Sequence, residues 1–374
     1  MTEMTMHVSE VTRGTTIEKL EVAAYTIPTD APESDGTYAW KATTLVTTHV
    51  TAGSHAGFGY SYADTATATL IHDMLASVVA GRDAMDIPGA WLAMVEAIRN
   101  LGRPGISSMA IAAVDTALWD LKAKLLDLPL CLLLGRVRDD VPIYGSGGFT
   151  SYSIERLQEQ LGGWARQGIP RVKMKIGTHP EDDVARVRAA REAIGPDTEL
   201  YVDANGAYTR VQALAQAERF AELGVVWFEE PVSSDDLEGL RFIRDRAPAG
   251  MTIAAGEYGY DQWYFRRMLD AGAVDTLQAD ATRCAGFTGF LRAATLADAH
   301  ATPLSAHCAP ALHLNACTAI QHLSPIEYFH DHVRIGNMLF DGMPQPRNGA
   351  LRPDLSRPGI GLELKRADAA PYAV

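Results

Sequence analysis

The stretch Arg171–Gly177, RVKMKIG, places two lysines two residues apart inside an apolar run. The alternation predicts a β-strand in which Lys173 and Lys175 point to one face while Val172 and Met174 point to the other. An exposed strand could carry such lysines with their ammonium groups in water. The apolar opposite face instead indicates a strand covered by helices, with its lysines directed toward a functional interior.

Seven other short apolar segments between Val141 and His330 have the same character, and most are followed by a segment of helical periodicity. No glycine-rich phosphate-binding turn marks a switch point, so the pattern favours a closed (β/α) barrel over an open doubly wound sheet. We expect the barrel to occupy residues 140–335. Its predicted strands are VPIYG, RVKMKI, ELYVDAN, VVWFEEP, TIAAGE, TLQAD, PLSAH and IEYFH.

The part of the chain before the barrel predicts a smaller α+β domain over residues 17–135. Residues 17–26 and 43–50 alternate in the manner of strands, and helical spacing follows them. A Pro/Gly-rich segment at about 345–374 has no role in the barrel and is expected to complete this N-terminal domain. Residues 1–16 lack a basic start and an apolar core, so they predict a flexible tail rather than a signal peptide.

Composition excludes several classes of partner for this chain of 374 residues. The 33 basic and 46 acidic residues give a formal net charge of −13, which argues against a nucleic-acid surface or an anionic membrane as partner. No apolar run is long enough to span a bilayer. The four cysteines form no CxxC pair and lie in apolar segments, which favours buried free thiols and a cytoplasmic location.

Three carboxylates lie at the carboxyl ends of consecutive predicted strands, where barrel enzymes assemble their chemistry. Asp203 and Glu229 are 26 residues apart, and Glu257 follows 28 residues later, so each spacing is about one strand–helix unit. Any one of them alone would be better explained as a solvated acid at a helix start. Three in register would repel one another unless a cation holds them, and ligation by oxygen alone favours Mg²⁺.

Candidate bases lie at the ends of two other strands. Lys175 is nearer its strand end than Lys173 and is the expected base. A second ammonium group and a metal ion should lower the pKa of Lys175 toward neutrality, while Lys173 also helps to hold the substrate anion. His307 follows PLSA, and Asp280 ends the preceding strand, close enough to fix the imidazole tautomer and raise its basicity.

Glu327 lies in the last predicted strand, and the sequence allows two interpretations of its role. It can stabilise the charge that develops on the substrate, if it is protonated. Alternatively, it can form a surface pair with His330 or His332.

These residues resemble the enolase superfamily, specifically its mandelate racemase subgroup. The resemblance lies in KMK, DAN, FEEP, GE, QAD and SAH, in Glu327, and in AIAAVDTALWDLKAKLLDLPLCLLLG, so it covers nearly the whole chain. It implies a modified (β/α)7β TIM barrel with an N-terminal α+β capping domain, one Mg²⁺, and a symmetric homo-oligomer. It also implies metal ligands at Asp203, Glu229 and Glu257, bases at Lys175 and the Asp280–His307 dyad, Glu327 beside the substrate, and Asn205 in contact with it.

The expected reaction begins by removing the proton α to a carboxylate of a small-molecule acid. We favour subsequent loss of water from a sugar acid, with His307 as the acid for the departing hydroxide. A loop expected around residues 28–40 is rich in hydroxyls and acids, and Arg283 and Ser146 lie near strand ends where they could meet distal polar groups. Trp40 could instead line an aromatic pocket.

Three other functions are alternatives to dehydration. A mandelate-like racemase or epimerase would return the proton to the same carbon. A non-catalytic sugar-acid binding protein would have no need of two lysines and a His/Asp dyad. Cycloisomerisation of a muconate-like diacid is disfavoured, because the resemblance there implies a lysine where this chain has Asp280.

Overall fold

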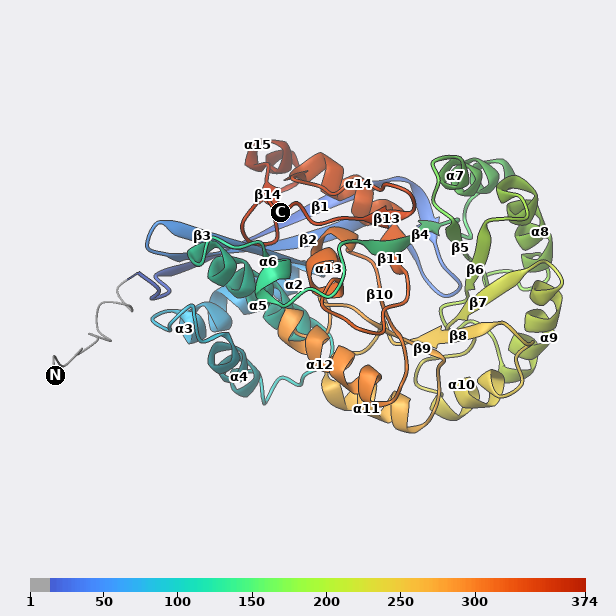
Figure 1. The fold of residues 1–374 in the computed structure, drawn as a ribbon, viewed down its shortest axis with the longest axis horizontal. Coiled ribbons are helices and arrows are strands. Elements are labelled where there is room, and N and C mark those ends of the chain that lie inside the picture. Colours follow the sequence, from blue (N-terminus) through green and yellow to red (C-terminus); the bar gives the residue numbers. More distant parts are fainter. Residues whose placement is uncertain (1–13) are drawn as a thin grey trace.

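Eight parallel strands form a curled sheet in the computed structural model, which describes residues 14–374 (Figure 1). Their hydrogen-bonded order is β10-β9-β8-β7-β6-β5-β4-β11. The predicted barrel strands are thereby confirmed. They are β4 (Val141–Gly147), β5 (Arg171–Lys175), β6 (Glu199–Asp203), β7 (Val225–Glu229), β8 (Thr252–Ala255), β9 (Thr276–Ala279), β10 (Leu304–Ala306) and β11 (Ile326–Phe329).

Helices cover the outer face of this sheet (Figure 1). Val172 and Met174 are fully buried against them, as the alternation in β5 predicts. Ser153 and Thr209 accept hydrogen bonds from main-chain N–H groups of the first turns of α7 and α9, which fixes where these helices begin. The helices are α7 (Ile154–Arg166), α8 (Asp183–Ile194), α9 (Arg210–Ala221), α10 (Leu237–Arg244), α11 (Gln262–Asp270), α12 (Gly286–Ala299), α13 (Pro310–Cys317) and α14 (His330–Leu339).

The two ends of the strand order, β10 and β11, are joined through the segment that precedes β11. The N–H of Leu304 donates to the carbonyl of His322 (2.9 Å), and the N–H of Ser324 donates back to the carbonyl of Leu304 (2.8 Å). The hydroxyl of Ser305 donates to the carbonyl of Pro325 at 2.7 Å. The sheet therefore closes into a barrel without a regular ladder at this seam.

An antiparallel sheet of β1 (Lys19–Ser34), β2 (Ala39–Ala52) and β3 (His55–Tyr62) precedes the barrel. Helices pack against it, and the long α5 leads back to the barrel (Figure 1). This arrangement confirms the expected α+β cap. The helical segments are α2 (Thr65–Leu70), the π-helical η1 (Ile71–Leu75), α3 (Ala76–Val79), α4 (Ile87–Ala97), α5 (Ile106–Leu125) and α6 (Leu130–Leu133).

The prediction of a loop around residues 28–40 is wrong, because most of that segment is strand. β1 continues to Ser34 with a register irregularity between Pro28 and Glu33, and β2 already begins at Ala39. Glu33 pairs with Trp40 across the hairpin and is buried. Cross-strand pairing thus outweighs the turn-like composition of the segment, and only its tip forms a turn.

The C-terminal segment contacts both parts of the molecule. β13 (Ala350–Leu351) pairs with β4 of the barrel, whereas Ala373 bridges to Tyr25 in β1. Most of the predicted tail over residues 1–16 lies outside the described residues, and Thr16 forms a bridge with Asp83. The remaining elements are β12 (Phe340–Asp341), which pairs with β14 (Glu363–Leu364), then α15 (Arg366–Ala369) and η2 (Ala370–Tyr372).

Two expectations from composition are met by the described residues. All four cysteines are buried and free. Within residues 14–374, every helix is too short or too polar to cross a bilayer.

Asp120 in α5 fastens the cap to the C-terminal segment. One carboxylate oxygen accepts the N–H of Phe58 in β3 at 2.7 Å and lies 2.7 Å from the ammonium group of Lys124. The other oxygen accepts the N–H of Ile360 at 2.7 Å. The carboxylate is fully buried, so it satisfies the N–H groups of Phe58 and Ile360 where water does not reach its oxygens.

We predict that Asp120→Ala lowers the free energy of unfolding by about 2–4 kcal/mol, since two buried N–H groups lose their acceptor. Urea denaturation monitored by circular dichroism would measure this. The control is Asp139→Ala, which removes one exposed ion pair with Arg136 and is expected to change the free energy by less than about 0.5 kcal/mol. Equal effects of the two substitutions would contradict the structural role of Asp120.

Candidate active site

Asp203, Glu229 and Glu257 converge at the carboxyl ends of adjacent strands. Asp203 and Glu229 are the last residues of β6 and β7 and are paired in register. One oxygen from each of the three carboxylates lies within 4.8 Å of the other two, and all three side chains are buried. Like charges this close require a counter-charge. The all-oxygen donor set suits a hard divalent cation such as Mg²⁺.

Gly256 allows Glu257 to turn into this cluster just beyond β8. Its φ of +136° is a conformation that residues with a side chain rarely adopt. A Cβ at this position would lie 2.1 Å from the carbonyl oxygen of Gln278, which is backbone and cannot yield. The motif AAGE therefore needs its glycine for the third carboxylate to reach the other two.

Both lysines of β5 point into the barrel and contact two of these carboxylates, Asp203 and Glu229. The ammonium group of Lys175 donates to Asp203 at 2.5 Å. That of Lys173 contacts Glu229 and lies 2.8 Å from Glu327 and 3.4 Å from Asp203. Lys173 is fully buried and Lys175 is 4% exposed, so neither ammonium group extends into bulk solvent.

The predicted lowering of the pKa of Lys175 depends on a metal ion as well as on Lys173, and the protein charges alone shift this pKa in the opposite direction. Burial lowers that pKa, and so does Lys173, as predicted. Attraction to Asp203 has the opposite effect, and the net result is a raised pKa for Lys175. The prediction counted the neighbouring positive charges and left out the carboxylate in direct contact.

His307 follows β10 and forms a dyad with Asp280, which follows β9. The Nδ1 atom of His307 lies 2.8 Å from Oδ2 of Asp280. The other oxygen of Asp280 accepts the N–H and the hydroxyl of Thr282, both at 2.7 Å. Burial raises the pKa of Asp280, but the hydrogen bond and charge of His307 outweigh burial and keep the pKa low.

An ionised Asp280 fixes the proton of His307 on Nδ1, which leaves Nε2 directed at the reaction site. That Nε2 atom lies 3.4 Å from Oε2 of Glu257. Lys175 and His307 therefore flank the carboxylate trio from opposite sides, since β6, β7 and β8 lie between their strands.

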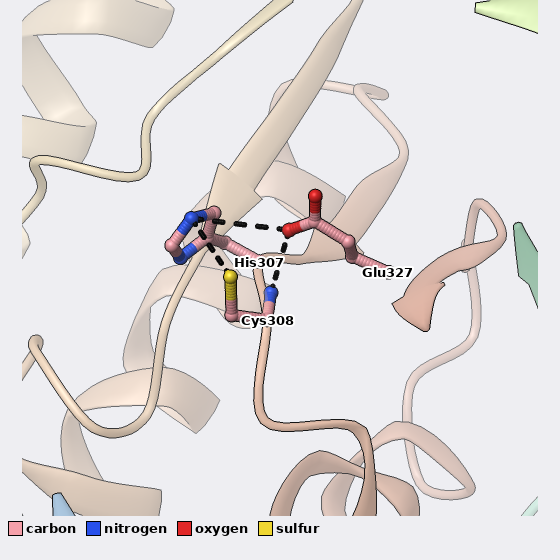
Figure 2. Close-up of side chains that lie close together, drawn as sticks. All are labelled: His307, Cys308 and Glu327. Atoms are coloured by element: carbon pink, nitrogen blue, oxygen red, sulfur yellow. Dashed lines mark hydrogen bonds and ion pairs between the residues drawn. The ribbon is translucent and has the colours of Figure 1, made fainter. Parts of the chain in front are cut away.

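Glu327 on β11 is fully buried among polar groups of three other strands or strand ends. It accepts the hydroxyl of Ser146 at 2.6 Å and the N–H of Cys308 at 2.7 Å. Figure 2 shows its carboxylate directed at the Cys308 nitrogen and the His307 imidazole, whose Nε2 is 3.8 Å away. A surface pair with a nearby histidine is thereby excluded.

The condition that Glu327 be protonated is not met by the arrangement of charges in this structure. Burial raises the pKa of Glu327, but attraction to Lys173, His307 and Lys175 outweighs burial and lowers it well below its usual range. The two histidines considered as surface partners lie elsewhere. His330 contacts Asp30, and His332 accepts the N–H of Ala309 while its ring stacks on Tyr62.

Several site residues were missed or misplaced by sequence reasoning. The thiol of Cys308 lies 3.2 Å from Nε2 of His307 (Figure 2). Ser146 is fully buried on Glu327, so it positions that carboxylate instead of meeting distal substrate groups. Glu230 is buried, and burial followed by repulsion from Glu257 raises its pKa well above the usual range. The sequence feature that could have identified Cys308, Ser146 and Glu230 is their position beside the ends of predicted strands.

The backbone directly after three strands adopts a left-handed conformation at residues other than glycine. Asn205 has φ of 45°, Glu230 has 38°, and Cys308 and Ala309 have 49° and 38°. Such conformations are strained and tend to occur where a site requires them. At Cys308 the conformation accompanies an N–H that donates to Glu327.

A cavity of about 430 Å³ opens between the cap and these strand ends. Of the five residues predicted to contact substrate, Asn205, Trp40 and Arg283 line it, whereas Lys173 and Glu327 are fully buried behind its wall. Arg283 is less available than expected, because its Nη1 donates to the carbonyl and to Oε1 of Glu257 at 3.1 and 3.2 Å. Trp40 donates its Nε1 hydrogen to Glu33 at 2.8 Å.

Residues 21–135 match the model of the mandelate racemase/muconate lactonizing enzyme N-terminal domain, and residues 156–369 match the enolase C-terminal domain-like model. The chain belongs to the mandelate racemase/muconate lactonizing enzyme family.

Relatives in this family act on sugar acids and their lactones. D-galactarolactone cycloisomerase of Agrobacterium fabrum is 33% identical over 76% of this chain and 79% of its own length. L-talarate/galactarate dehydratase of Salmonella typhimurium is 32% identical over 82% of this chain and 77% of its own length. Arabinonate dehydratase of Saccharolobus solfataricus is 32% identical over 70% of this chain and 72% of its own length.

Solved structures of the family share the whole architecture. A mandelate racemase/muconate lactonizing enzyme-like protein from Rubrobacter xylanophilus is 56% identical, with a TM-score of 0.94 over 96% of this chain and 100% of its own. A mutant L-talarate/galactarate dehydratase, liganded with Mg and L-glucarate, is 28% identical, with a TM-score of 0.90 over 100% of this chain and 95% of its own.

Glu33 accepts a hydrogen bond from Trp40 in the cavity wall, and its ionisation makes the stability of the protein depend on pH. Burial, and then repulsion from Asp331, raise its pKa to about 8, and its Oε1 atom has no hydrogen-bond partner among the described residues. The folded protein therefore retains a proton on Glu33 that the unfolded chain releases near pH 4.5. Stability contributed by this proton must fall as pH rises from about 4.5 to 8.

We predict that Glu33→Gln flattens the decline of Tm between about pH 5.5 and 8.5. The amide oxygen can still accept from Trp40, and an amide does not ionise. Differential scanning fluorimetry across this range would compare wild type, Glu33→Gln and the exposed control Glu159→Gln. Identical pH slopes in wild type and Glu33→Gln would show that Glu33 does not retain the proton.

Proposed function

We propose that the protein is a Mg²⁺-dependent acid-sugar dehydratase. The observation that carries the proposal is the placement of Lys175 and His307 on opposite sides of the three buried carboxylates. Relatives named as sugar-acid dehydratases and a neighbour liganded with Mg support it. Asp203, Glu229 and Glu257 would hold the ion. The bound ion supplies positive charge that stabilises the enediolate and counters the three carboxylates.

The first step is removal of the proton α to the substrate carboxylate. We assign this step to Lys175, whose contact with Asp203 holds its ammonium group at the edge of the trio. Lys175 must be neutral to accept the proton, so its attraction to Asp203 has to be offset in the active complex. Lys173 remains paired with Glu327 and Glu229 and positions positive charge beside the substrate anion.

The second step is loss of the β-hydroxyl group. We assign the proton for this step to Nε2 of His307, whose Nδ1 is held by Asp280. The C–O bond breaks with its electron pair on oxygen, and the proton from His307 converts the departing hydroxide to water. The electron pair of the former C–H bond forms the C–C double bond, and the resulting enol becomes a 2-keto-3-deoxy acid.

The same two groups would also serve a racemase or epimerase. If His307 instead delivers a proton to the α-carbon from the face opposite Lys175, the configuration inverts and no water is lost. The flanking geometry is common to both reactions, so the products must distinguish them. A non-catalytic binding protein would exchange no α-hydrogen at all.

We predict that Lys175→Ala and His307→Asn each lower kcat by at least about 10²-fold, a typical loss for a general base or acid. The measurement incubates the protein with Mg²⁺ and a panel of acid sugars plus mandelate in D2O. NMR then follows both keto product and α-deuterium. Lys19→Ala and His322→Asn replace exposed residues of the same types and should retain full activity.

The products decide between the alternatives. Keto acid formed by wild type and lost in both variants supports dehydration. Inversion or exchange without keto acid would make the protein a racemase or epimerase. Absence of exchange with every acid would exclude proton abstraction.

A further inference from the structure

The cavity between cap and barrel has two chemically different ends. Lys175, Glu257 and His307 line the barrel end, where the proposed function places the substrate carboxylate. Asp35 from the tip of the β1–β2 hairpin and Asp64 from the start of α2 line the cap end. The distal end of a sugar acid must therefore lie against cap residues.

The cap end offers hydroxyl groups and negative charge. Tyr38, Thr43 and Thr44 line it together with the two aspartates. Oδ1 of Asp35 accepts the N–H groups of Thr37 and Tyr38, both at 2.7 Å, so the carboxylate is fixed by its own turn. These groups can bind the hydroxyls of a polyol, and they repel an anion.

Among the described lining residues, the lysine and arginine side chains are Lys175 and Arg283, and both already have carboxylate partners. Lys175 contacts Asp203. Arg283 lies 3.2 Å from Oε1 of Glu257 and 3.9 Å from Oδ2 of Asp280, and its side chain is 22% exposed. In the part of the chain that the structure describes, each lysine or arginine lining the cavity is thus already paired with a carboxylate, and none is left over for a second substrate carboxylate.

Histidine does not supply the missing charge at the cap end. His332 lines the cavity with its ring stacked on Tyr62, the ring centroids being 3.4 Å apart. Burial lowers the pKa of His332 to about 3, so the ring is neutral at physiological pH. A distal anion would find a neutral aromatic surface there.

An adjoining cavity of about 590 Å³ shares Asn205 and Tyr258 with the first and has the same sign of charge. Asp235 and Asp261 line it, against a single described arginine, Arg267. A longer substrate that extended in this direction would again meet more negative than positive charge.

We propose that the substrate is a polyhydroxy monoacid with a neutral distal end, and that sugar diacids are disfavoured. The inference rests on the proposed function, because it takes the first carboxylate to lie at the barrel end. A second carboxylate would be placed near Asp35 and Asp64 without a free cation, and like charges oppose such binding. The charge of the cap end, more than its size, sets this preference.

The experiment compares acid pairs that differ only at the terminal carbon, namely D-galactonate with galactarate and D-gluconate with D-glucarate. With Mg²⁺ present, we expect kcat/KM to favour the monoacid by at least 30-fold in any pair that is turned over. A diacid used equally well would overturn the inference and leave dehydration intact. Turnover of no acid in the wider panel would reject the proposed function and this inference together.

A double variant tests whether the charges of Asp35 and Asp64 cause the preference for monoacids. Asp35→Asn with Asp64→Asn removes two charges and retains acceptors for the turn and for the N–H of Ala66. Relative kcat/KM for diacid over monoacid should rise about fivefold at low ionic strength, and the gain should shrink with added salt. Asp139→Asn, an exposed acid outside the cavity, should not change the ratio. An unchanged ratio in the double variant would overturn the electrostatic explanation.

Discussion

Repulsion among buried carboxylates is the constraint on which the barrel mouth depends. Asp203, Glu229 and Glu257 lie within a few ångströms of one another. Lys173 and Lys175 are the counter-charges of Asp203 and Glu229, and Arg283 is that of Glu257. Burying so many ionised groups is costly, and apolar residues of the same size would often stabilise a fold better. The arrangement is therefore explained by chemistry at the site. A divalent cation and the two lysines are alternative counter-charges for Asp203 and Glu229.

The fold meets this constraint by placing each charge at a strand end and correcting the local backbone there. Parallel strands bring residues of distant segments to one edge. Gly256, with φ of +136°, turns Glu257 inward. Left-handed conformations at Asn205 and Cys308 adjust the neighbouring positions, at a cost of about 1–3 kcal/mol each. The surrounding hydrophobic core, in which the barrel strands pack against the helices outside them, maintains these conformations.

The sequence predicted the barrel and the members of the charged cluster because both follow from local pattern and spacing. The strand period put Lys173 and Lys175 on one face, and the repeat length brought Asp203 to the same mouth as the other acids. Protonation states were not predictable, since the pKa of Lys175 depends on its contact with Asp203 and that of Glu327 on the neighbouring Lys173. The hairpin at residues 28–40 was missed because cross-strand pairing is not a local property.

The central claim is that the three carboxylates bind one divalent cation, and Mn²⁺ titration followed by electron paramagnetic resonance tests it most directly. The account predicts one Mn²⁺ per chain, displaced by Mg²⁺, with affinity reduced at least about 10²-fold in Asp203→Asn while circular dichroism stays unchanged. Absence of bound Mn²⁺, or equal affinity in wild type and Asp203→Asn, would contradict the assignment of the site.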